Sequence, residues 1–278
     1  MKRKHVLYIL CVALIVLFSL GPIVWCFIIS ISPEQEMLTA GGGVLPSRVL
    51  FTHYADIFDA SSKAHQAVFG GLANSIKISL LTIALGVPIS YLTAYGLARF
   101  DFPHKTLYVR LLLLTVVIPV FTTIIPVYNV FRELDLLDNI FWNCVIYISS
   151  FLPLNTWIMM NYIKELPEEL WQAAAIDGFS EREIFTRIAL PLSKPILLTT
   201  TLILFLMAWK QYMIPMILLS SYENKPLTMI LSEFMTRYAI DYGTIAAVGV
   251  VSVLPPAIAA ILFRKFLVSG LAAGAVKR

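Results

Sequence analysis

Side chains that could perform chemistry are few and scattered in this chain of 278 residues. The histidines stand far apart, so they suggest neither a metal site nor a catalytic triad; they are His5, His53, His65 and His104. The glycine run at 41–43 lacks the lysine and the serine or threonine that complete a nucleotide-binding loop. We therefore expect no catalytic residue, no metal ligand and no bound cofactor on this chain.

One block of charged and small residues, at 166–195, lies between two long apolar runs and is the strongest candidate for a contact site. Pro167 suits the first turn of a helix, where its missing N–H group costs nothing. Gly178 can adopt the left-handed conformation that closes a short helix through the alanines at 173–175. These residues predict a first helical arm that starts near Pro167 and ends near Gly178.

A second arm is predicted from the residues that follow Gly178. Ser180 stands three residues before Glu183, which is the spacing of a capping box that opens a helix. Pro191 and Pro195 are expected to end that helix. We expect the two arms to form a water-exposed helix–turn–helix, called the knob here, although many loops between helices are only solvated connections.

A second cluster of polar residues interrupts an apolar run at Trp209, Lys210, Gln211 and Tyr212. If the run forms one helix from Ile196, Lys210 lies about 21 Å along it, past the midplane of a membrane. A lysine at that depth is costly on a lipid-facing side, so it either faces a wet cavity or extends to the outer interface. A cavity that contains Lys210 would favour a solute with a carboxylate or a phosphate.

The composition places both sites in a membrane protein. Hydrophobic residues make up 59% of the chain and charged residues 14%, and the mean hydropathy is +0.81. The net charge of +4 comes from basic residues in short connections between apolar runs, which indicates orientation in a membrane and argues against a nucleic-acid partner. The sequence therefore predicts an all-α, polytopic membrane protein in contact with lipid.

Six transmembrane helices are predicted, and the whole chain, 1–278, is expected to form one transmembrane domain. The spans lie at about 6–31, 73–97, 107–130, 140–163, 196–219 and 245–263. This topology places most lysines and arginines near span ends in the cytoplasm, as the positive-inside rule requires. Both termini and the knob are then cytoplasmic, and residues 32–71 form an outer segment.

The knob resembles the EAA loop in permease subunits of binding-protein-dependent ABC importers. Residues 172–178 read QAAAIDG and residues 188–191 read IALP, against a family form of EAA-x-x-x-G followed by I-x-L-P. Further phrases resemble those of the carbohydrate-type branch of this family; they lie at 53–58, 94–100 and 274–277 and around Trp209. The resemblance implies the type I ABC importer permease fold.

The resemblance also implies that the first arm is a coupling helix that docks into a separate ATPase subunit. The residues implied for this contact are Glu169, Gln172, Ala173, Ala174, Asp177, Gly178 and Pro191. Gln172 stands where the family usually has Glu, which keeps the hydrogen-bonding capacity but removes the charge. Glu168 and Glu169 lie about one helical turn earlier and are expected to supply that charge.

By the same resemblance, the chain is a non-catalytic subunit that imports a sugar or oligosaccharide across the inner or plasma membrane of a prokaryote. The implied partners are a second related permease, two ATPase subunits that use ATP and Mg²⁺, and an external solute-binding protein. An importer for glycerophosphodiesters or peptides is an alternative, and a secondary transporter is a less favoured one.

Six residues are candidates for the solute path, because aromatic rings and amides suit sugars: Asn155, Trp157, Trp209, Lys210, Gln211 and Tyr212. Single polar residues within spans also form helix–helix hydrogen bonds, so that interpretation stays open. Lys210 and Gln211 replace residues that in the family are usually Asn and an acid. Both changes shift the local charge toward positive, which predicts a solute that can be acidic.

Overall fold

The structure is a computed structural model that describes residues 2–37, 43, 45–235 and 241–273. The predicted all-α class is confirmed, because the described residues form helices joined by turns and contain no β-strand. The glycines at 41 and 42, the phrase at 274–277 and the carboxy-terminal end lie outside the described residues. The chain divides into two compact units, Met1–Leu72 with Leu227–Pro255, and Ala73–Pro226 with Pro256–Arg278.

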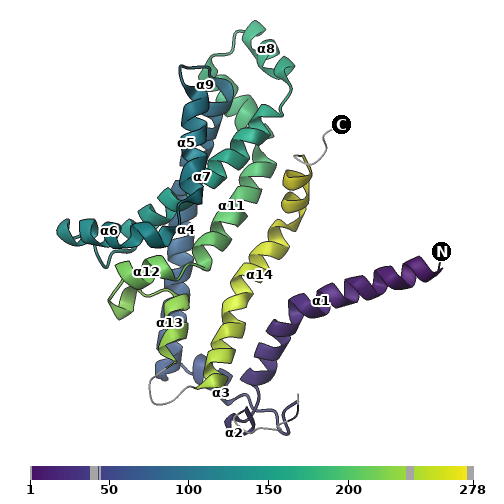
Figure 1. The fold of residues 1–278 in the computed structure, drawn as a ribbon, viewed down its shortest axis with the longest axis vertical. Helices are drawn as coiled ribbons and strands as arrows, with labels where there is room; N and C mark the ends of the chain where they lie inside the picture. Colours follow the sequence, from purple (N-terminus) through teal and green to yellow (C-terminus); the bar gives the residue numbers. More distant parts are fainter. Residues whose placement is uncertain (1, 38–42, 44, 236–240, 274–278) are drawn as a thin grey trace. The chain divides into compact units, whose positions relative to one another are not determined.

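The first unit contains the short helices of the predicted outer segment (Figure 1). Its elements are α1 (Lys2–Ser30), α2 (Glu34–Met37), α3 (Thr52–Phe58), α13 (Leu227–Glu233) and the first parts of α4 (Lys63–Arg99) and α14 (Tyr242–Ala273). Helix α3 is attached to two neighbours. The Tyr54 hydroxyl lies 2.7 Å from Ser30 Oγ of α1. His53 Nδ1 lies 3.1 Å from Thr244 Oγ1 of α14.

Two glycines allow close contacts between helices in this unit. A Cβ atom on Gly71 of α4 would lie 2.8 Å from Ile230 Cγ1 of α13. A Cβ atom on Gly243, at the start of α14, would collide with the ring of His53. Helix α4 runs through Gly71 without a break and begins at Lys63, ten residues before the predicted span at 73–97.

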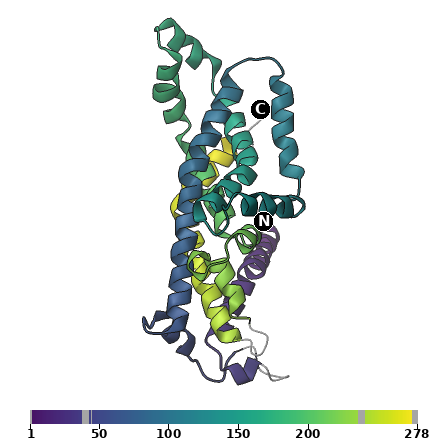
Figure 2. The ribbon, with the colours of Figure 1, turned by 90° about the vertical axis from the view of Figure 1, so that its left-hand side faces the viewer.

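The second unit is a helix bundle in which α7 (Ile140–Lys164) packs against α5, α11 and α12. Its other elements are the remaining parts of α4 and α14, α5 (Lys105–Val117), α6 (Val120–Glu133), α8 (Glu168–Ile176), α9 (Glu181–Glu183), the π-helical η1 (Ile184–Ala189), α10 (Leu190–Leu192), α11 (Lys194–Trp209), α12 (Met213–Leu218) and the 3₁₀ turn η2 (Tyr222–Asn224). Figures 1 and 2 both show α8 beyond the ends of α4 and α7. One apolar cluster joins α4, α7 and the knob around Met159.

Three described helices are long and apolar enough to cross a membrane, and up to five spans result if each bent helix pair counts as one. The three are His5–Ser30, Lys63–Arg99 and Tyr242–Lys265. The pairs are Lys105–Val117 with Thr122–Glu133, bent by 96°, and Glu181–Leu192 with Lys194–Trp209, bent by 70°. These helices agree with a multi-pass membrane protein, and the count of six stays a prediction.

The predicted span at 140–163 forms the single helix α7, yet it is not among these candidates. It carries polar side chains such as Asn143 and Asn155, and both are buried. Because neighbouring helices cover these side chains, they avoid the cost of exposing polar groups to lipid. An apolarity test alone therefore misses a helix that the bundle itself surrounds.

Two predicted spans are interrupted in the structure. The run at 107–130 breaks at Ile118 and Pro119, which are both extended, because a residue before proline avoids helical angles. The run at 196–219 is helical only to Trp209, and α12 begins at Met213. The expectation that Lys210 lies within a continuous helix is therefore wrong.

Asp138 joins the connection after α6 to the connection after α12, and both were predicted to be outer loops. Its Oδ1 accepts hydrogen bonds from the backbone N–H groups of Ser220 and Ser221, at 3.1 and 3.0 Å. The Asn224 amide donates to its backbone carbonyl at 2.8 Å. Partial burial by itself raises the pKa of the Asp138 carboxyl, but the hydrogen bonds outweigh burial and hold the pKa below its ordinary value. The two connections thus lie at the same end of the second unit.

We predict that Asp138→Gly lowers the thermal unfolding midpoint of the purified protein in detergent more than Asp138→Asn does. Both replacements tolerate the positive φ of 55° at this position, but only Asn keeps an oxygen that can accept the two backbone N–H groups. Leaving these donors unpaired costs about 1–3 kcal/mol.

The control is Glu133→Ala, which removes an exposed carboxylate nearby and is expected to leave the midpoint unchanged. Equal midpoints for the Gly and Asn variants would contradict this account.

Because the folded-state pKa of Asp138 is lowered, the stabilisation by its charge is present at neutral pH and is lost as the pH falls through that lowered value.

Candidate functional site

The inner side of α8, the first arm of the knob, packs against the bundle. Trp171 and Ala174, three residues apart on the helix, have 5% and 3% of their surfaces exposed. They belong to one apolar cluster with Met159 of α7 and Ile184 of the second arm. Ala174, which the sequence placed in a partner contact, therefore forms part of the knob's own core.

The opposite side of α8 is a continuous exposed surface, called the outer face here. Spacings of three, four and seven residues from the first member place four exposed side chains on it: Glu169, Gln172, Ala173 and Ile176. Ile176 has 86% of its surface exposed. No role was predicted for Ile176 from sequence, and its seven-residue spacing from Glu169 is the signal that identifies it.

Gly178 forms the turn between the two arms, as the sequence predicted. Its φ is +78°, in the left-handed region that favours glycine. The Gly178 N–H donates to the Ala175 carbonyl at 3.2 Å, and the Phe179 N–H donates to the Ala174 carbonyl at 3.0 Å. Asp177 and Gly178 are exposed at this turn, next to the end of the outer face.

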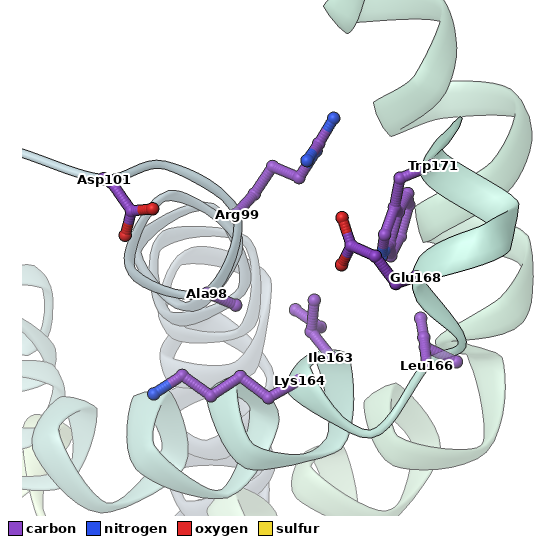
Figure 3. A pocket seen from close by; sticks show the side chains of 8 residues that line it. All are labelled: Ala98, Arg99, Asp101, Ile163, Lys164, Leu166, Glu168 and Trp171. Atoms are coloured by element: carbon purple, nitrogen blue, oxygen red, sulfur yellow. The ribbon is translucent and has the colours of Figure 1, made fainter. Parts of the chain in front are cut away.

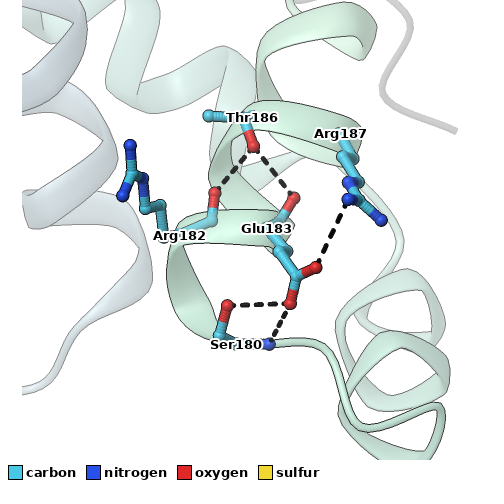
Figure 4. Close-up of polar contacts among 5 residues, drawn as sticks. All are labelled: Ser180, Arg182, Glu183, Thr186 and Arg187. Atoms are coloured by element: carbon cyan, nitrogen blue, oxygen red, sulfur yellow. Dashed lines mark hydrogen bonds and ion pairs between the residues drawn. The ribbon is translucent and has the colours of Figure 1, made fainter.

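The second arm begins with the predicted capping interaction (Figure 4). Glu183 Oε2 accepts hydrogen bonds from the Ser180 N–H at 3.1 Å and from the Ser180 hydroxyl at 2.9 Å. The other carboxylate oxygen, Oε1, lies 3.5 Å from Arg187 Nη2, one turn further along. The start of the second arm is therefore stabilised by residues within that arm and the turn before it.

Pro191 does not end the second arm, contrary to the sequence prediction. The chain passes through the π-helical segment η1 and continues as α10 to Leu192, with Pro191 exposed within α10. The π-helical bonding before Pro191 accommodates a residue that cannot donate a backbone hydrogen bond. The bend of 70° follows at Ser193, and Pro195 lies in the first turn of α11.

Aromatic residues of α4 contact the second arm along its length. The Tyr91 hydroxyl donates to Ser193 Oγ at 3.0 Å. One turn later, the Tyr95 ring packs edge-to-face on Phe185 of η1, with 5.0 Å between the ring centres. The second arm is thereby attached to α4 at its middle and at its end.

The last turn of α4 holds the start of the second arm through Glu181. Glu181 Oε1 accepts a hydrogen bond from the Tyr95 hydroxyl at 2.5 Å and lies 3.4 Å from Arg99 Nε. The Arg99 guanidinium also lies 5.5 Å from the ring centre of Trp171, on the first arm. Helix α4 consequently contacts both arms of the knob.

A cavity of about 300 Å³ lies between the end of α4, the end of α7 and the start of α8 (Figure 3). Cations and carboxylates both line it, together with an indole ring: the lining residues are Ala98, Arg99, Asp101, Ile163, Lys164, Leu166, Glu168 and Trp171. The cavity borders the start of the first arm on the side of Trp171 and Glu168.

The residues predicted to line a solute path do not share one surface on α7. Asn155 is buried, and its Nδ2 donates to the Phe151 carbonyl at 2.9 Å. Trp157 follows two residues later, on the other side of the helix, with 39% of its surface exposed. This hydrogen bond lies within α7 and does not join two helices, and Asn155 Oδ1 is buried without a hydrogen-bond partner among the described residues, so both interpretations of Asn155 stay predictions.

The second predicted path cluster lies where α11 ends. Trp209 is buried and stacks on Phe205, with 5.6 Å between the ring centres. Lys210 is exposed at the end of α11, where the carbonyl groups of the last helical turn favour a cation. Gln211 and Tyr212 are partly buried and connect α11 to α12. A part in a solute path stays a prediction for these residues.

We predict that Ala174→Leu destabilises the protein whereas Ala173→Leu does not. The added methyl groups at 174 would enter a packed core, where overpacking typically costs about 1–3 kcal/mol. At 173 they would extend into solvent from the outer face. Thermal unfolding midpoints of the two purified variants in the same detergent check the difference. Equal midpoints would show that α8 does not pack by the side described here.

Solved structures that resemble this chain include a bacterial ABC transporter involved in the import of the acidic polysaccharide alginate. The matched chain is 22% identical, with a TM-score of 0.79 and coverage of 95% of this chain and 96% of that one. An alginate ABC transporter in complex with a periplasmic protein bound to an alginate pentasaccharide has 18% identity and a TM-score of 0.67, with 96% of each chain covered. At these identities the likeness shows the fold, which is that of a type I ABC importer permease.

Similar sequences extend over nearly the full chain. The trehalose transport system permease protein SugB of Mycobacterium tuberculosis is 30% identical over 270 residues, which cover 95% of this chain and 94% of SugB. The trehalose/maltose transport system permease protein MalG of Thermococcus litoralis is 29% identical over 275 residues, which cover 99% of this chain and 97% of MalG. The family model for the inner membrane component of binding-protein-dependent transport systems matches residues 86–272. The resemblance first suggested by the knob is therefore confirmed, and this chain belongs to the family of binding-protein-dependent transport system inner membrane components.

Proposed function

We propose that this chain is the transmembrane permease subunit of an ATP-driven importer for a sugar or oligosaccharide. The relatives named for trehalose and for trehalose and maltose support a carbohydrate as the solute. The observation that carries the coupling role is the outer face of α8, which the fold presents to solvent beyond the ends of α4 and α7. The membrane is the inner or plasma membrane of a prokaryote.

The outer face docks onto a separate ATPase subunit. Ile176 is a large apolar side chain almost fully in water, and its burial in a partner's groove would contribute about 1.5–3 kcal/mol. Ala173 lies beside it on the same face, and its small side chain lets the partner approach the helix closely. Asp177 and Gly178 border this contact at the turn, and exposed Pro191 lies further along, on the second arm.

In this proposal Glu169, and not the residue at position 172, supplies the negative charge of the contact. Gln172 keeps hydrogen-bonding capacity without a charge, whereas Glu169 is exposed three residues earlier on the same face. An ATPase arginine that would pair with a family glutamate can therefore reach a carboxylate one turn away.

ATP and Mg²⁺ belong to the partner subunits in this proposal, and the chain is a non-catalytic conduit and lever. The sequence contains no nucleotide-binding loop, which supports a separate motor of two ATPase subunits. A solute-binding protein is supported by the solved alginate transporter, which was captured with a periplasmic protein. The apolar side chains along α1 are exposed, and they suit contact with lipid or with a second, related permease.

The orientation places the knob, at 166–195, and both termini in the cytoplasm, and the segment at 32–71 outside. The distribution of lysine and arginine supports this orientation. The Asp138 link agrees with this topology, because it holds together two connections that the topology assigns to one side of the membrane. An importer for glycerophosphodiesters or peptides is the alternative within this family.

We expect the tagged protein, isolated from its native membrane in mild detergent, to bring down an ATP-hydrolysing subunit. Ala173→Leu and Ile176→Asp, on the outer face, are expected to lower recovery of that subunit about tenfold, because a bulky or charged side chain prevents close docking. Mass spectrometry and an ATPase assay on the eluate measure the recovery. Glu133→Ala, at the exposed end of α6, is the matched control and retains the subunit.

Failure of the unaltered protein to recover an ATPase subunit would overturn the proposed function. Retention of the subunit by both outer-face variants would instead place the contact elsewhere on the chain. Gln172→Glu restores the family charge and is expected to strengthen recovery. Unchanged recovery together with unchanged coupled ATP hydrolysis would show that residue 172 does not tune the contact.

Lys210→Asn tests whether the importer accepts acidic sugars through this residue. If the Lys210 ammonium faces the solute, the variant lowers uptake of a uronate-containing oligosaccharide about fivefold relative to a neutral one. If Lys210 only stabilises the end of α11, the ratio of the two uptake rates is unchanged. Uptake of both labelled sugars by cells that carry only the variant gives this ratio, and an unchanged value refutes the acidic preference.

A further inference from the structure

We propose that Arg99 is the positioning residue that ties both arms of the knob to α4, so that movement of α8 is passed into α4. The inference rests on the proposed function, in which α8 docks onto an ATPase subunit. It adds the residue of this chain through which the docked helix acts on the bundle.

Arg99 has a separate interaction with each arm. Its Nε lies 3.4 Å from Glu181 Oε1, at the start of the second arm. Its Cζ lies 5.5 Å from the ring centre of Trp171, on the first arm, within the range of a cation–π contact. Arg99 is also the last residue of α4, where a cation is favoured by the carbonyl end of the helix. The side chain is 25% exposed, so these interactions are only partly screened by water.

The two contacts require the shape of a guanidinium group. Its edge can pair with a carboxylate while its planar face lies over an aromatic ring. A lysine ammonium is a point charge on a flexible stem and cannot present an edge and a face together. The position therefore depends on arginine itself and not only on a positive charge.

Besides the apolar cluster that α4 shares with both arms, the polar and aromatic contacts of Tyr91 and Tyr95 reach the second arm. Tyr91 bonds to Ser193, and Tyr95 contacts Phe185 and Glu181. Arg99 extends this row by one further helical turn and adds the contact with Trp171 on α8. It is thus placed to keep α8 in register with the second arm across the turn at Gly178.

The attachment of α8 by Arg99 lies at the border of the cavity beside that helix. Arg99 and Trp171 both line the cavity of about 300 Å³ (Figure 3). Trp171 borders the cavity with one part of its surface and packs in the apolar cluster with the rest, so the Arg99 contact adds to that packing in setting the position of the first arm. Helix α4 continues from Arg99 back to Lys63 as one helix, and a displacement of Arg99 is therefore carried along a long element.

The test uses the complete importer, purified with its ATPase subunits, reconstituted in lipid vesicles and supplied with its solute-binding protein. The number of solute molecules imported per ATP hydrolysed is measured for Arg99→Met, Arg99→Lys and Glu181→Gln. We expect Arg99→Met to keep the ATPase subunit bound and active while the imported number per ATP falls about tenfold. Arg99→Lys is expected to recover only part of the loss, because it restores the charge without the planar group.

A double variant and a charge control separate positioning from general stability. If Arg99 acts through Glu181, the double variant Arg99→Met with Glu181→Gln is no worse than the more impaired single variant. Lys105→Met removes a positive charge from the start of α5, where Lys105 pairs with the exposed Asp101 at 3.0 Å. This pair joins residues only four positions apart and contacts neither arm of the knob in the contacts described above, so the control is expected to import normally.

Three outcomes would overturn the proposal. If import and ATP hydrolysis fall in equal proportion in Arg99→Met, Arg99 contributes to docking or folding and does not transmit movement. Full recovery of the number of solutes per ATP in Arg99→Lys would show that position 99 requires only a positive charge. An unchanged number of solutes per ATP in Arg99→Met would show that another contact transmits the movement. If the unaltered chain binds no ATPase subunit, the proposed function fails before Arg99 is tested.

Discussion

The carboxylate of Glu181 is the contact that fixes how the knob leaves the bundle. One of its oxygens accepts a hydrogen bond from Tyr95 and faces Arg99, and both residues belong to the last turns of α4. A carboxylate held by a hydroxyl and a cation is constrained in direction as well as in position. The second arm continues from this point through η1 and α10, and a bend of 70° then leads into α11, which packs against α7. The first arm is placed by the same contact, through the stacking of Arg99 on Trp171.

The parts of the knob that were predicted correctly are those whose partners are close in sequence. Gly178 closes α8 with a positive φ, and Ser180 with Glu183 opens the second arm, because each interaction spans only a few residues. The attachment to α4 was not predicted, since Tyr95 and Glu181 are 86 positions apart and the phrase at 94–100, which contains Tyr95, does not indicate its partner. Pro191 was misjudged for a related reason. A proline breaks regular α-helical bonding, but a π-helical segment before it allows the helix to continue.

The apolar runs of the sequence predicted the positions of most long helices. They were a poorer guide to the residues at which those helices begin or are interrupted. Helix α4 starts ten residues before its predicted apolar run, and Gly71 in this added part packs directly on α13, a contact between segments distant in sequence. Helix α7 forms at the predicted residues although its apolar run includes polar side chains. Neighbouring helices of the bundle cover those side chains. Because α11 ends at Trp209, Lys210 lies exposed at the end of a helix and not within a continuous span. Hydropathy reports contact with lipid, and it cannot report contact between helices.

The four members of the outer face lie within eight consecutive residues of one short helix, from Glu169 to Ile176, and they touch neither Arg99 nor Glu181 in the contacts described here. The same stretch contains Trp171 and Ala174, which attach α8 to the bundle from its opposite side. The surface proposed to dock on a motor subunit and the surface that attaches α8 to the membrane domain are therefore interleaved in sequence and separated only by helical periodicity. Insertion or deletion of a single residue within α8 would turn one surface by about 100° toward the place of the other.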